Sequence, residues 1–409
     1  MSMALRVLVV GGGVGGLCLA QGLRQARVAV RVFERDPTAH TRGQGYRLRI
    51  DEHGIRALAR CLPGELFRLF RATTNPPYPP RGAVFDHHLE QIWSFATRSG
   101  PADPRRASTV ANRRTLREVL LAGLGDAVAF GREVVGVSAA ADRASVHFRD
   151  GTVETGDLVV AADGVNSVVR HHVLPHAQLY DTGLRGIYGH ANLDQHLLDV
   201  LPAALFGGSS PVLGPAGTTL AVGVYQPVRP PHRAAPRIAP YARLSPVAEY
   251  VKWTLVAPVD SYGLTETGFW ALPPERLHTL ARRVTADWHP ALAELVALSE
   301  TATTFALSIR AGLPVDPWPA SRVTLLGDAI HATTPVGGTG ANTALRDAAL
   351  LTRYLSEVNE GRIGMLAAVS RYEARMRRYG FAAAQRSLLG AERIFRAPVP
   401  AFLGKADTP

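Results

Sequence analysis

The order of apolar and polar positions predicts that the chain opens with a strand, a helix and a second strand. Residues 5–10 are an uninterrupted apolar run, which is typical of a strand buried on both faces. The glycines of 11–16 predict a turn, residues 17–25 have helical periodicity, and residues 29–34 form a second buried strand. Such a βαβ unit indicates a parallel sheet with helices packed on it.

The following segments are expected to return to this first unit. Residues 44–50 are strand-like, and Asp51 is placed to cap the next helix. Short strands are expected at 84–86 and 91–96, and a helix at about 114–124. A meander follows, with a hairpin turn at Asp150-Gly151 and strands expected at 133–139, 145–149 and 158–162.

From about residue 181 to 270 the pattern changes to separated β-rich segments. These lie at 186–191, 218–225 and 250–256, and they predict a second sheet. Residues 227–246 are rich in proline and arginine without periodicity, so we expect a long irregular loop or a lid there. Helical patterns resume at 274–288, a buried strand is expected at 323–326, and helices continue from 339 onward.

Composition narrows the class of protein. With 409 residues, 46% of them hydrophobic, the chain can bury a large core and enclose a sizeable cofactor. Neither a membrane-spanning apolar stretch nor a signal peptide is visible, so we expect a cytoplasmic protein without a membrane partner. Cys18 and Cys61 give neither a disulfide framework nor metal-ligand spacing, so no metal is expected and both are interpreted as buried apolar residues.

The net charge of +11 does not indicate a nucleic-acid partner. The basic residues are scattered, and all except Lys252 and Lys405 are arginines. No basic block alternates with aromatic residues that could stack on bases, so no nucleic acid is expected. Arginine does suit anionic ligands such as a pyrophosphate or an acidic or phenolate substrate.

The first motif is the GxGxxG of residues 11–16, which stands between a strand and a helix. Gly11 permits the tight turn, Gly13 lets the backbone approach a pyrophosphate, and Gly16 permits close packing of helix on strand. Glu34 ends the next strand, where its carboxylate is placed to accept hydrogen bonds from a ribose. The motif predicts a dinucleotide site and does not distinguish FAD from NAD.

The second motif covers residues 327–342 and follows the expected strand at 323–326. Asp328 leaves the strand end, and a proline-anchored glycine loop then opens a helix. The positive end of that helix would stabilise negative charge near N1 of a reduced flavin. For His331 we expect a structural hydrogen bond rather than a role as a base, because its neighbours in the sequence supply no orienting acid.

A third motif, residues 163–170, is a capped turn directly after the buried run 158–162. In this order and separation, the three motifs closely resemble those of the class A flavoprotein hydroxylases, the family of para-hydroxybenzoate hydroxylase and salicylate hydroxylase. The resemblance covers about residues 4–380. It implies a mixed α/β (α+β) fold, with a Rossmann-like FAD-binding domain, an interleaved β-sheet substrate domain and C-terminal helices.

The predicted division of the chain is discontinuous. The FAD-binding domain is expected to comprise residues 1–80, 105–180 and 300–360. The substrate-binding sheet is expected to comprise residues 82–104 and 181–275, and residues 361–409 are expected to form C-terminal helices and a tail.

The resemblance also implies which residues contact a noncovalent FAD. Glu34 and Arg35 are similar to the family pair at the adenosine ribose, and Val134 stands where backbone touches adenine. Asp163 would face the pyrophosphate and the nicotinamide side, and Asp328 the ribityl chain. The full implied set is Gly11, Gly13, Val14, Gly15, Gly16, Glu34, Arg35, Arg42, Arg113, Val134, Asp163, Asp328, Pro335, Gly338, Gly340 and Asn342. Of these, Arg42 would face the flavin side and the last four would contact the isoalloxazine ring.

The implied reaction is hydroxylation of a hydrophobic aromatic or polycyclic small molecule by O2. No second GxGxxG opens a separate nicotinamide domain, so NAD(P)H is expected to bind transiently over the flavin and reduce it. Oxygen would then add at C4a, and the hydroperoxide would deliver the hydroxyl group. No catalytic side chain is assigned. The alternatives are epoxidation, Baeyer–Villiger oxidation or dehydrogenation on the same fold, or a non-catalytic flavin-binding protein.

Substrate contacts are less defined by the sequence. Arg47 and Arg49 share one face of their strand, where one of them would meet an anionic substrate, or where both would face solvent or hold the cofactor. Four further residues are either the lining of an apolar pocket or ordinary sheet packing: Tyr188, His190, Tyr225 and Trp270. The oligomeric state is left open.

Overall fold

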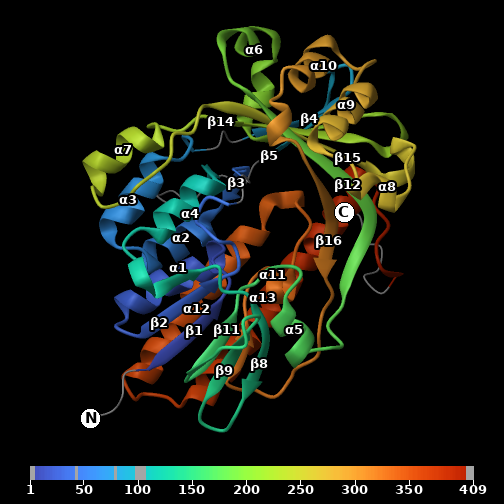
Figure 1. Cartoon of the computed structure of the whole chain (residues 1–409). Coiled ribbons are helices and arrows are strands. Elements are labelled where there is room, and N and C mark those ends of the chain that lie inside the picture. The colour runs from blue at the N-terminus through green and yellow to red at the C-terminus, as the bar shows by residue number, and fades with distance from the viewer. Residues whose placement is uncertain (1–4, 42–44, 78–80, 97–106, 402–409) are drawn as a thin grey trace.

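Five parallel strands form the centre of the first unit in the computed structural model, which describes residues 5–41, 45–77, 81–96 and 107–401 (Figure 1). The strand order is β17-β11-β1-β2-β7, and each neighbouring pair is parallel. The strands are β1 (Arg6–Val10), β2 (Ala29–Glu34), β7 (Val128–Phe130), β11 (Leu158–Ala161) and β17 (Val323–Leu325). The apolar run of the N-terminus therefore lies inside a sheet that is covered on both faces, as its pattern predicted.

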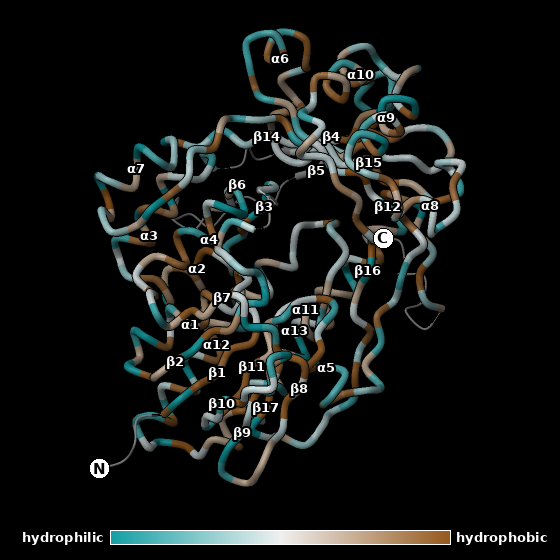
Figure 2. Tube along the Cα trace, viewed as in Figure 1, coloured by the Kyte–Doolittle hydropathy of each residue, from teal (hydrophilic) through white to brown (hydrophobic). Residues whose placement is uncertain are grey.

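Helices cover one face of this sheet and an antiparallel meander covers the other. The helical layer contains α1 (Val14–Gln25), α2 (Glu52–Cys61), α12 (Gly340–Asn359) and α13 (Met365–Phe395). The meander consists of β8 (Val134–Ala139), β9 (Ala144–Phe148) and β10 (Val153–Gly156). Phe33 on β2 meets Phe148 on β9 edge to face at 4.9 Å, which joins the meander to the core. Figure 2 shows the hydrophobic positions gathered along β1, β11 and α12.

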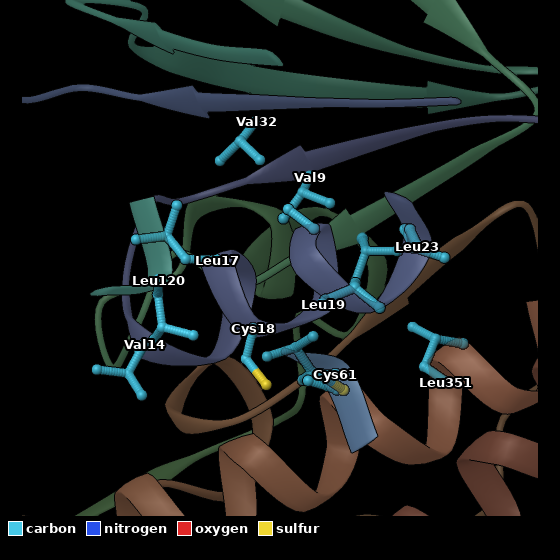
Figure 3. Close-up of a cluster of buried hydrophobic side chains, with 14 of the residues drawn as sticks. Val9, Val14, Leu17, Cys18, Leu19, Leu23, Val32, Cys61, Leu120 and Leu351 are labelled. Carbon is cyan, nitrogen blue, oxygen red and sulfur yellow. The ribbon is translucent and has the colours of Figure 1, made fainter. Parts of the chain in front are cut away.

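Helix α1 is apolar nearly all round because it is packed between the sheet and the other helices. Figure 3 shows Leu17, Leu19 and Leu23 projecting from α1 toward neighbouring elements. Cys18 and Cys61 are free thiols with no exposed surface, which confirms that both are buried apolar residues.

A short two-stranded sheet connects the first unit with the second. It pairs β3 (Arg47–Ile50) with β6 (Thr109–Asn112), and α4 (Arg113–Leu121) follows β6 directly. Asp51 caps α2 by accepting hydrogen bonds from the backbone N–H groups of His53 and Gly54, as the sequence predicted.

The second unit is built on a seven-stranded sheet of order β16-β12-β15-β14-β13-β4-β5. Its strands are β4 (Arg81–Asp86), β5 (Gln91–Ala96), β12 (Leu179–Asn192), β13 (Ser209–Leu213), β14 (Thr219–Tyr225), β15 (Tyr250–Pro258) and β16 (Phe305–Gly312). The outer face packs on α6 (Gln195–Val200), α8 (Glu266–Trp270), α9 (Pro274–Val284) and α10 (Pro290–Ala297), around a core of its own. The inner face of β14 contacts β3 and β6.

Strand β16 belongs to the second sheet by its hydrogen bonds. It pairs antiparallel with β12, with Tyr188 opposite Phe305. Residues 305–312 thus lie in the sheet, although the sequence grouped 300–360 with the nucleotide-binding segments. The periodicity of one short strand does not say which sheet it joins, since both sheets need apolar strands.

The expectation of an irregular loop at 227–246 was wrong in its central part. Residues Pro231–Ile238 form helix α7, which packs on α3 (Gly64–Ala72) with Ala234 and Ala235 buried in the first core. Pro231 stands in the first helical turn, where the backbone N–H has no intrahelical partner in any residue, so this proline costs the helix nothing. Tyr241 further anchors the segment through a hydrogen bond to Glu65.

Candidate functional site

The carboxyl ends of β1 and β2 open into a cleft, and the residues of the first motif line it. Most of the expected adenosine-side and pyrophosphate-side residues are brought together there. Those lining the cleft are Gly11, Gly13, Glu34, Arg35, Arg113, Val134 and Asp163. Arg42 lies outside the described residues, and Val14 and Gly15 are buried in the first turn of α1, where Gly15 approaches Leu326.

The three motif glycines are required for different reasons. Gly11 has a φ of 107°, and a Cβ there would lie 2.4 Å from the carbonyl oxygen of Ala162. A Cβ on Gly16 would lie 2.2 Å from the carbonyl oxygen of Gly11. A Cβ on Gly13 would meet no protein atom within 4 Å, because this residue faces the cleft. Gly11 and Gly16 serve the fold, whereas the open space at Gly13 fits a ligand that approaches the backbone.

The beginning of α1 presents backbone donors to the same space. Gly13 is its N-cap, and among the described residues no side chain caps it and no acid stands in its first turn. The first N–H groups of a helix have no intrahelical acceptor, and the helix dipole favours an anion there. The arrangement therefore fits a pyrophosphate.

Glu34 is held rigidly at the edge of the cleft. Its carboxylate accepts hydrogen bonds from the N–H of Gly12 at 2.9 Å and of Asp36 at 3.0 Å. Arg117 on α4 lies 3.7 Å from the carboxylate and donates to the carbonyl of Gly12 at 2.9 Å. Arg117 was not among the site residues predicted from the sequence, because only the packing of α4 against the glycine turn brings it to the cleft. The spacing of Arg113 and Arg117, one helical turn apart, was the available signal.

Asp163 sits where β11 ends, beside the glycine turn. One carboxylate oxygen accepts from the N–H of Val168 at 2.9 Å, and the other is buried without a partner among the described residues. Burial raises the pKa of this carboxyl group, although hydrogen bonds from Ser167 and the following backbone oppose the rise. This open acceptor position at the cleft fits a donor group of a bound ligand.

Asp328 is not among the residues that line the cleft, but it follows β17, which belongs to the same sheet as β1 and β2. It begins α11 (Asp328–His331) after Gly327, whose φ is 62°. Its side chain reaches the surface, and the protein atoms around it raise the pKa of its carboxyl group by desolvation, against the lowering effect of the charges of His331 and Arg113. Asp328 therefore lies within electrostatic reach of Arg113, which lines the cleft.

The glycine loop after Asp328 is fixed by side chains of other elements. Asn342 is buried and donates to the carbonyl oxygens of Arg49 at 2.9 Å and Gly338 at 2.8 Å, while it accepts from the N–H of Asp51 at 2.9 Å. Its side chain therefore holds the glycine loop against β3 and the start of α2. The loop therefore presents backbone groups, from exposed Pro335 through Gly338 to Gly340.

His331 has an acid partner that its neighbours in the sequence did not reveal. Its Nε2 lies 2.7 Å from Asp347 on α12, and both side chains are fully buried. Asp347 also accepts from Tyr379 at 2.6 Å and from the N–H of Gly327 at 2.8 Å. Burial lowers the pKa of His331, but the charge and hydrogen bond of Asp347 more than offset this, so the net shift is upward. The argument from the sequence, that no acid orients His331, was therefore wrong. The role expected for His331, a structural hydrogen bond, agrees with these buried contacts.

The expected substrate residues separate into two groups. Tyr188 and His190 lie on the inner face of the second sheet, near Arg47. Tyr225 is fully buried and donates to the carbonyl of Thr73, which is a packing role. Trp270 is 45% exposed on α8, where it donates to Glu266, so the structure does not bring it to the others.

Arg47 and Arg49 both donate from β3 to carbonyl groups of other elements. Arg47 donates from Nε to Val224 at 3.0 Å and from Nη2 to Gly208 at 2.9 Å. Arg49 donates to the carbonyl of Gly337 at 3.3 Å, so it borders the glycine loop.

No described helix is both long and apolar enough to cross a membrane. Within the same ranges, no group of three or more His, Cys, Asp or Glu side chains is arranged to hold a metal ion.

Comparison with known proteins places the chain in a family. A family model described as an FAD binding domain matches residues 275–387, and one described as an NAD(P)-binding Rossmann-like domain matches residues 9–73. A dual O-methyltransferase/FAD-dependent monooxygenase of Cercospora beticola is 32% identical over 95% of this chain and 46% of its own length. The chain thus spans about half the length of that relative.

Two other relatives are matched over most of their length. The 2-heptyl-3-hydroxy-4(1H)-quinolone synthase of Pseudomonas aeruginosa is 30% identical, over 85% of this chain and 80% of its own. The solved structure of a putative FAD-containing monooxygenase from Photorhabdus luminescens superposes with a TM-score of 0.82 at 30% identity, covering 96% of this chain and 99% of that one. With the cleft and its three motifs, these matches show that the chain belongs to the FAD-dependent monooxygenases of the class A flavoprotein hydroxylase type.

Proposed function

We propose that the chain hydroxylates an aromatic or polycyclic small molecule, with FAD as its noncovalent cofactor, NAD(P)H as transient reductant and O2 as co-substrate. The observation that carries this proposal is the continuity of the site. The cleft runs from the glycine turn and Glu34 to Arg113, and Asp328 lies within electrostatic reach of Arg113. The glycine loop beyond Asp328 borders β3, which contacts the second sheet through β14.

The chain's own residues would bind and orient the groups that react. Backbone donors at the start of α1 would hold the pyrophosphate, and Glu34 and Arg35 would lie at the adenosine end. Asp328 would accept from the ribityl hydroxyls, and the glycine loop would lie against the ring system. When bound, FAD accepts a hydride and activates oxygen for transfer, which is chemistry that side chains do not supply. The aromatic inner face of the second sheet would orient the substrate.

Related proteins support the substrate class and leave the individual compound open. The Pseudomonas relative is named for a hydroxylated quinolone, and the Cercospora relative for a monooxygenase joined to an O-methyltransferase. We propose a flat, partly hydrophobic substrate of this kind, and a cytoplasmic location, which agrees with two buried free cysteines.

A screen of purified protein tests the function. Heat denaturation is expected to release FAD, and a subset of phenolic and polycyclic compounds is expected to stimulate NAD(P)H oxidation and to gain one oxygen atom. Product mass and fragmentation separate ring hydroxylation from epoxidation, Baeyer–Villiger insertion and dehydrogenation. Release of FMN, or bound FAD with no stimulation by any compound, would contradict the proposal and favour a flavin-binding protein without catalysis.

Asp328→Ala is expected to weaken FAD binding far more than His331→Ala does. A hydrogen bond to a charged group is worth roughly 1.5 to 3 kcal/mol, so the FAD dissociation constant should rise about 10-fold to 100-fold. His331 is buried behind the cleft against Asp347, so its loss should lower the free energy of unfolding instead. Flavin fluorescence titration and urea unfolding measure the two effects separately. Equal increases in the dissociation constant would reject the role given to Asp328.

A further inference from the structure

The inner face of the second sheet carries polar side chains that the cofactor cleft does not use. His190 on β12, Lys252 on β15 and Gly223 on β14 stand opposite one another in register, so they form one row across the sheet. The alternate residues, such as Trp253, point to the other face and pack in the second core. Lys252 is only 9% exposed.

Arg47 reaches this row from β3 of the first unit. Gly223 leaves the room for it, because a Cβ there would lie 3.1 Å from the guanidinium carbon of Arg47. Burial, together with the neighbouring charge of Arg47, lowers the pKa of Lys252 to about 7. Lys252 therefore lies beside a second cation and away from bulk water, and an anion placed next to it would favour its charged form.

The protein satisfies only part of the hydrogen-bonding capacity at this place. The Lys252 ammonium has three donors, and one of them bonds the carbonyl of Ala221 at 2.9 Å. Among the described residues, Arg47 is the charged group that acts on the pKa of Lys252, and no carboxylate does so. The hydroxyl of Tyr188 and the Nδ1 of His190 are buried without a hydrogen-bond partner in the described chain. Tyr188 itself is 5% exposed.

Aromatic rings surround these polar groups. Tyr188 stacks on Phe305 with ring centroids 4.8 Å apart and meets Tyr46 edge to face at 6.2 Å. His190 lies 4.7 Å from the ring of Tyr250. The titratable and charged groups around Lys252 are thus Arg47 on β3, Tyr188 and His190 on β12, and Tyr250 on its own strand, together with Glu300, whose charge acts on His190. These aromatic rings, together with the hydrogen-bond donors of Lys252 and Tyr188 that no described residue uses, match a flat ring that bears an oxygen anion.

We propose that Lys252 binds the phenolate or enolate oxygen of the substrate, with Arg47 and Tyr188 beside it, so that the enzyme selects flat rings carrying an acidic hydroxyl group. This inference rests on the proposed function and names its substrate class. In its neutral form the Lys252 amine takes the proton of the substrate hydroxyl: the O–H bond breaks, an N–H bond forms, and no electron is transferred to or from the protein. The resulting oxygen anion donates electron density to the ring carbons ortho and para to it, where an electrophilic oxygen is accepted.

The position of the row relative to the cofactor site supports this assignment. Arg49 shares the strand face of Arg47 and borders the glycine loop through Gly337. A ring held at Lys252 would therefore lie on the face of the second sheet that contacts β3 through β14.

The chain offers a selective probe, because Lys252 and Lys405 are its two lysines. In holoenzyme labelled with 13C at the lysine ε-carbon, one resonance is expected to titrate near neutral pH, and Lys405→Arg assigns the other. Adding 1-naphthol is expected to raise the Lys252 midpoint by about one pH unit or more, since a nearby anion favours the ammonium form. The neutral ether 1-methoxynaphthalene should not shift it. A larger shift with 1-naphthoate would assign the site to a carboxylate, and the absence of any shift with 1-naphthol up to its solubility limit would overturn the proposal.

A variant pair extends the test to affinity. Lys252→Met keeps an unbranched side chain that is one atom shorter and removes the charge, so the dissociation constant of 1-naphthol should rise about 10-fold to 100-fold while that of FAD stays unchanged. Lys405→Met removes the same charge elsewhere and is the matched control. Unchanged naphthol affinity in Lys252→Met, with naphthol still stimulating NAD(P)H oxidation, would reject the inference and leave the proposed function standing. Failure of the whole phenol screen would reject the function, while the lysine titration would still report binding.

Discussion

Replacing Gly13 with valine is expected to abolish FAD retention without unfolding the protein. Gly13 has φ −79° and ψ −179°, an extended conformation that a β-branched residue adopts readily. Its Cβ would meet no protein atom within 4 Å, so the isopropyl group would occupy the open cleft in front of α1. That space is where the backbone would approach the pyrophosphate, so the bulk should exclude the cofactor.

The flavin content after desalting measures this effect, and circular dichroism of the apoprotein measures the fold. Gly16→Ala is the matched control, because its Cβ would lie 2.2 Å from the carbonyl oxygen of Gly11 inside the protein. We expect Gly16→Ala to lower the melting temperature of the apoprotein, and Gly13→Val to leave it near the wild-type value. Normal FAD binding by Gly13→Val would place the pyrophosphate elsewhere.

Asp347→Ala is expected to destabilise the protein by roughly 3 to 5 kcal/mol, the usual cost of breaking a buried charged pair. The carboxylate accepts from His331, Tyr379 and the N–H of Gly327, and the substitution leaves all three donors without their acceptor. Because Gly327 precedes Asp328, FAD affinity should fall as well. Tyr379→Phe removes a single bond and should cost only about 1 kcal/mol.

The same variant should change how stability depends on pH. The folded pKa of His331 lies above its ordinary value of 6.5, so its pairing with Asp347 stabilises the fold fully below that value. The contribution is lost as pH rises through the raised folded pKa. Urea unfolding at about pH 6 and about pH 8.5 should therefore show a loss of stability in the wild type that Asp347→Ala lacks. An equal loss in both proteins would show that other groups cause it.

Local patterns allowed much of the fold to be predicted from the sequence. Strand β1, helix α1 and strand β2 follow from an apolar run, a glycine turn and helical periodicity, each of which depends on adjacent residues. Helix α7 was missed because its prolines were interpreted as breaking a helix. Pro231 stands in the first turn, where a helix tolerates it, and buried alanines hold the segment on α3 in spite of Pro236 inside the helix.

The candidate site shows the same limit. The motif glycines can be recognised from their spacing in the sequence, whereas Asp347, the partner of His331, lies 16 residues away on another helix. Arg117 and Lys252 carry no motif at all. Arg117 reaches the cleft because α4 packs on the glycine turn, and Lys252 meets Arg47 because two sheets of different units approach each other. Such juxtapositions depend on tertiary packing, which a single sequence does not display.

Helix α13 joins the two sheets and limits how far they can move apart when a substrate enters. Its 31 residues span roughly 46 Å at 1.5 Å per residue. Near its start, Tyr372 bonds the carbonyl of Leu325 in the parallel sheet, and at its end Phe395 packs with Leu184 and Val256 of the other sheet. A continuous helix fixed at both ends acts as a strut that resists hinge opening between the two sheets. Substrate exchange is therefore expected to depend on local movements of loops and side chains around a rigid frame, and turnover should be less sensitive to solvent viscosity than in enzymes whose domains close over the substrate.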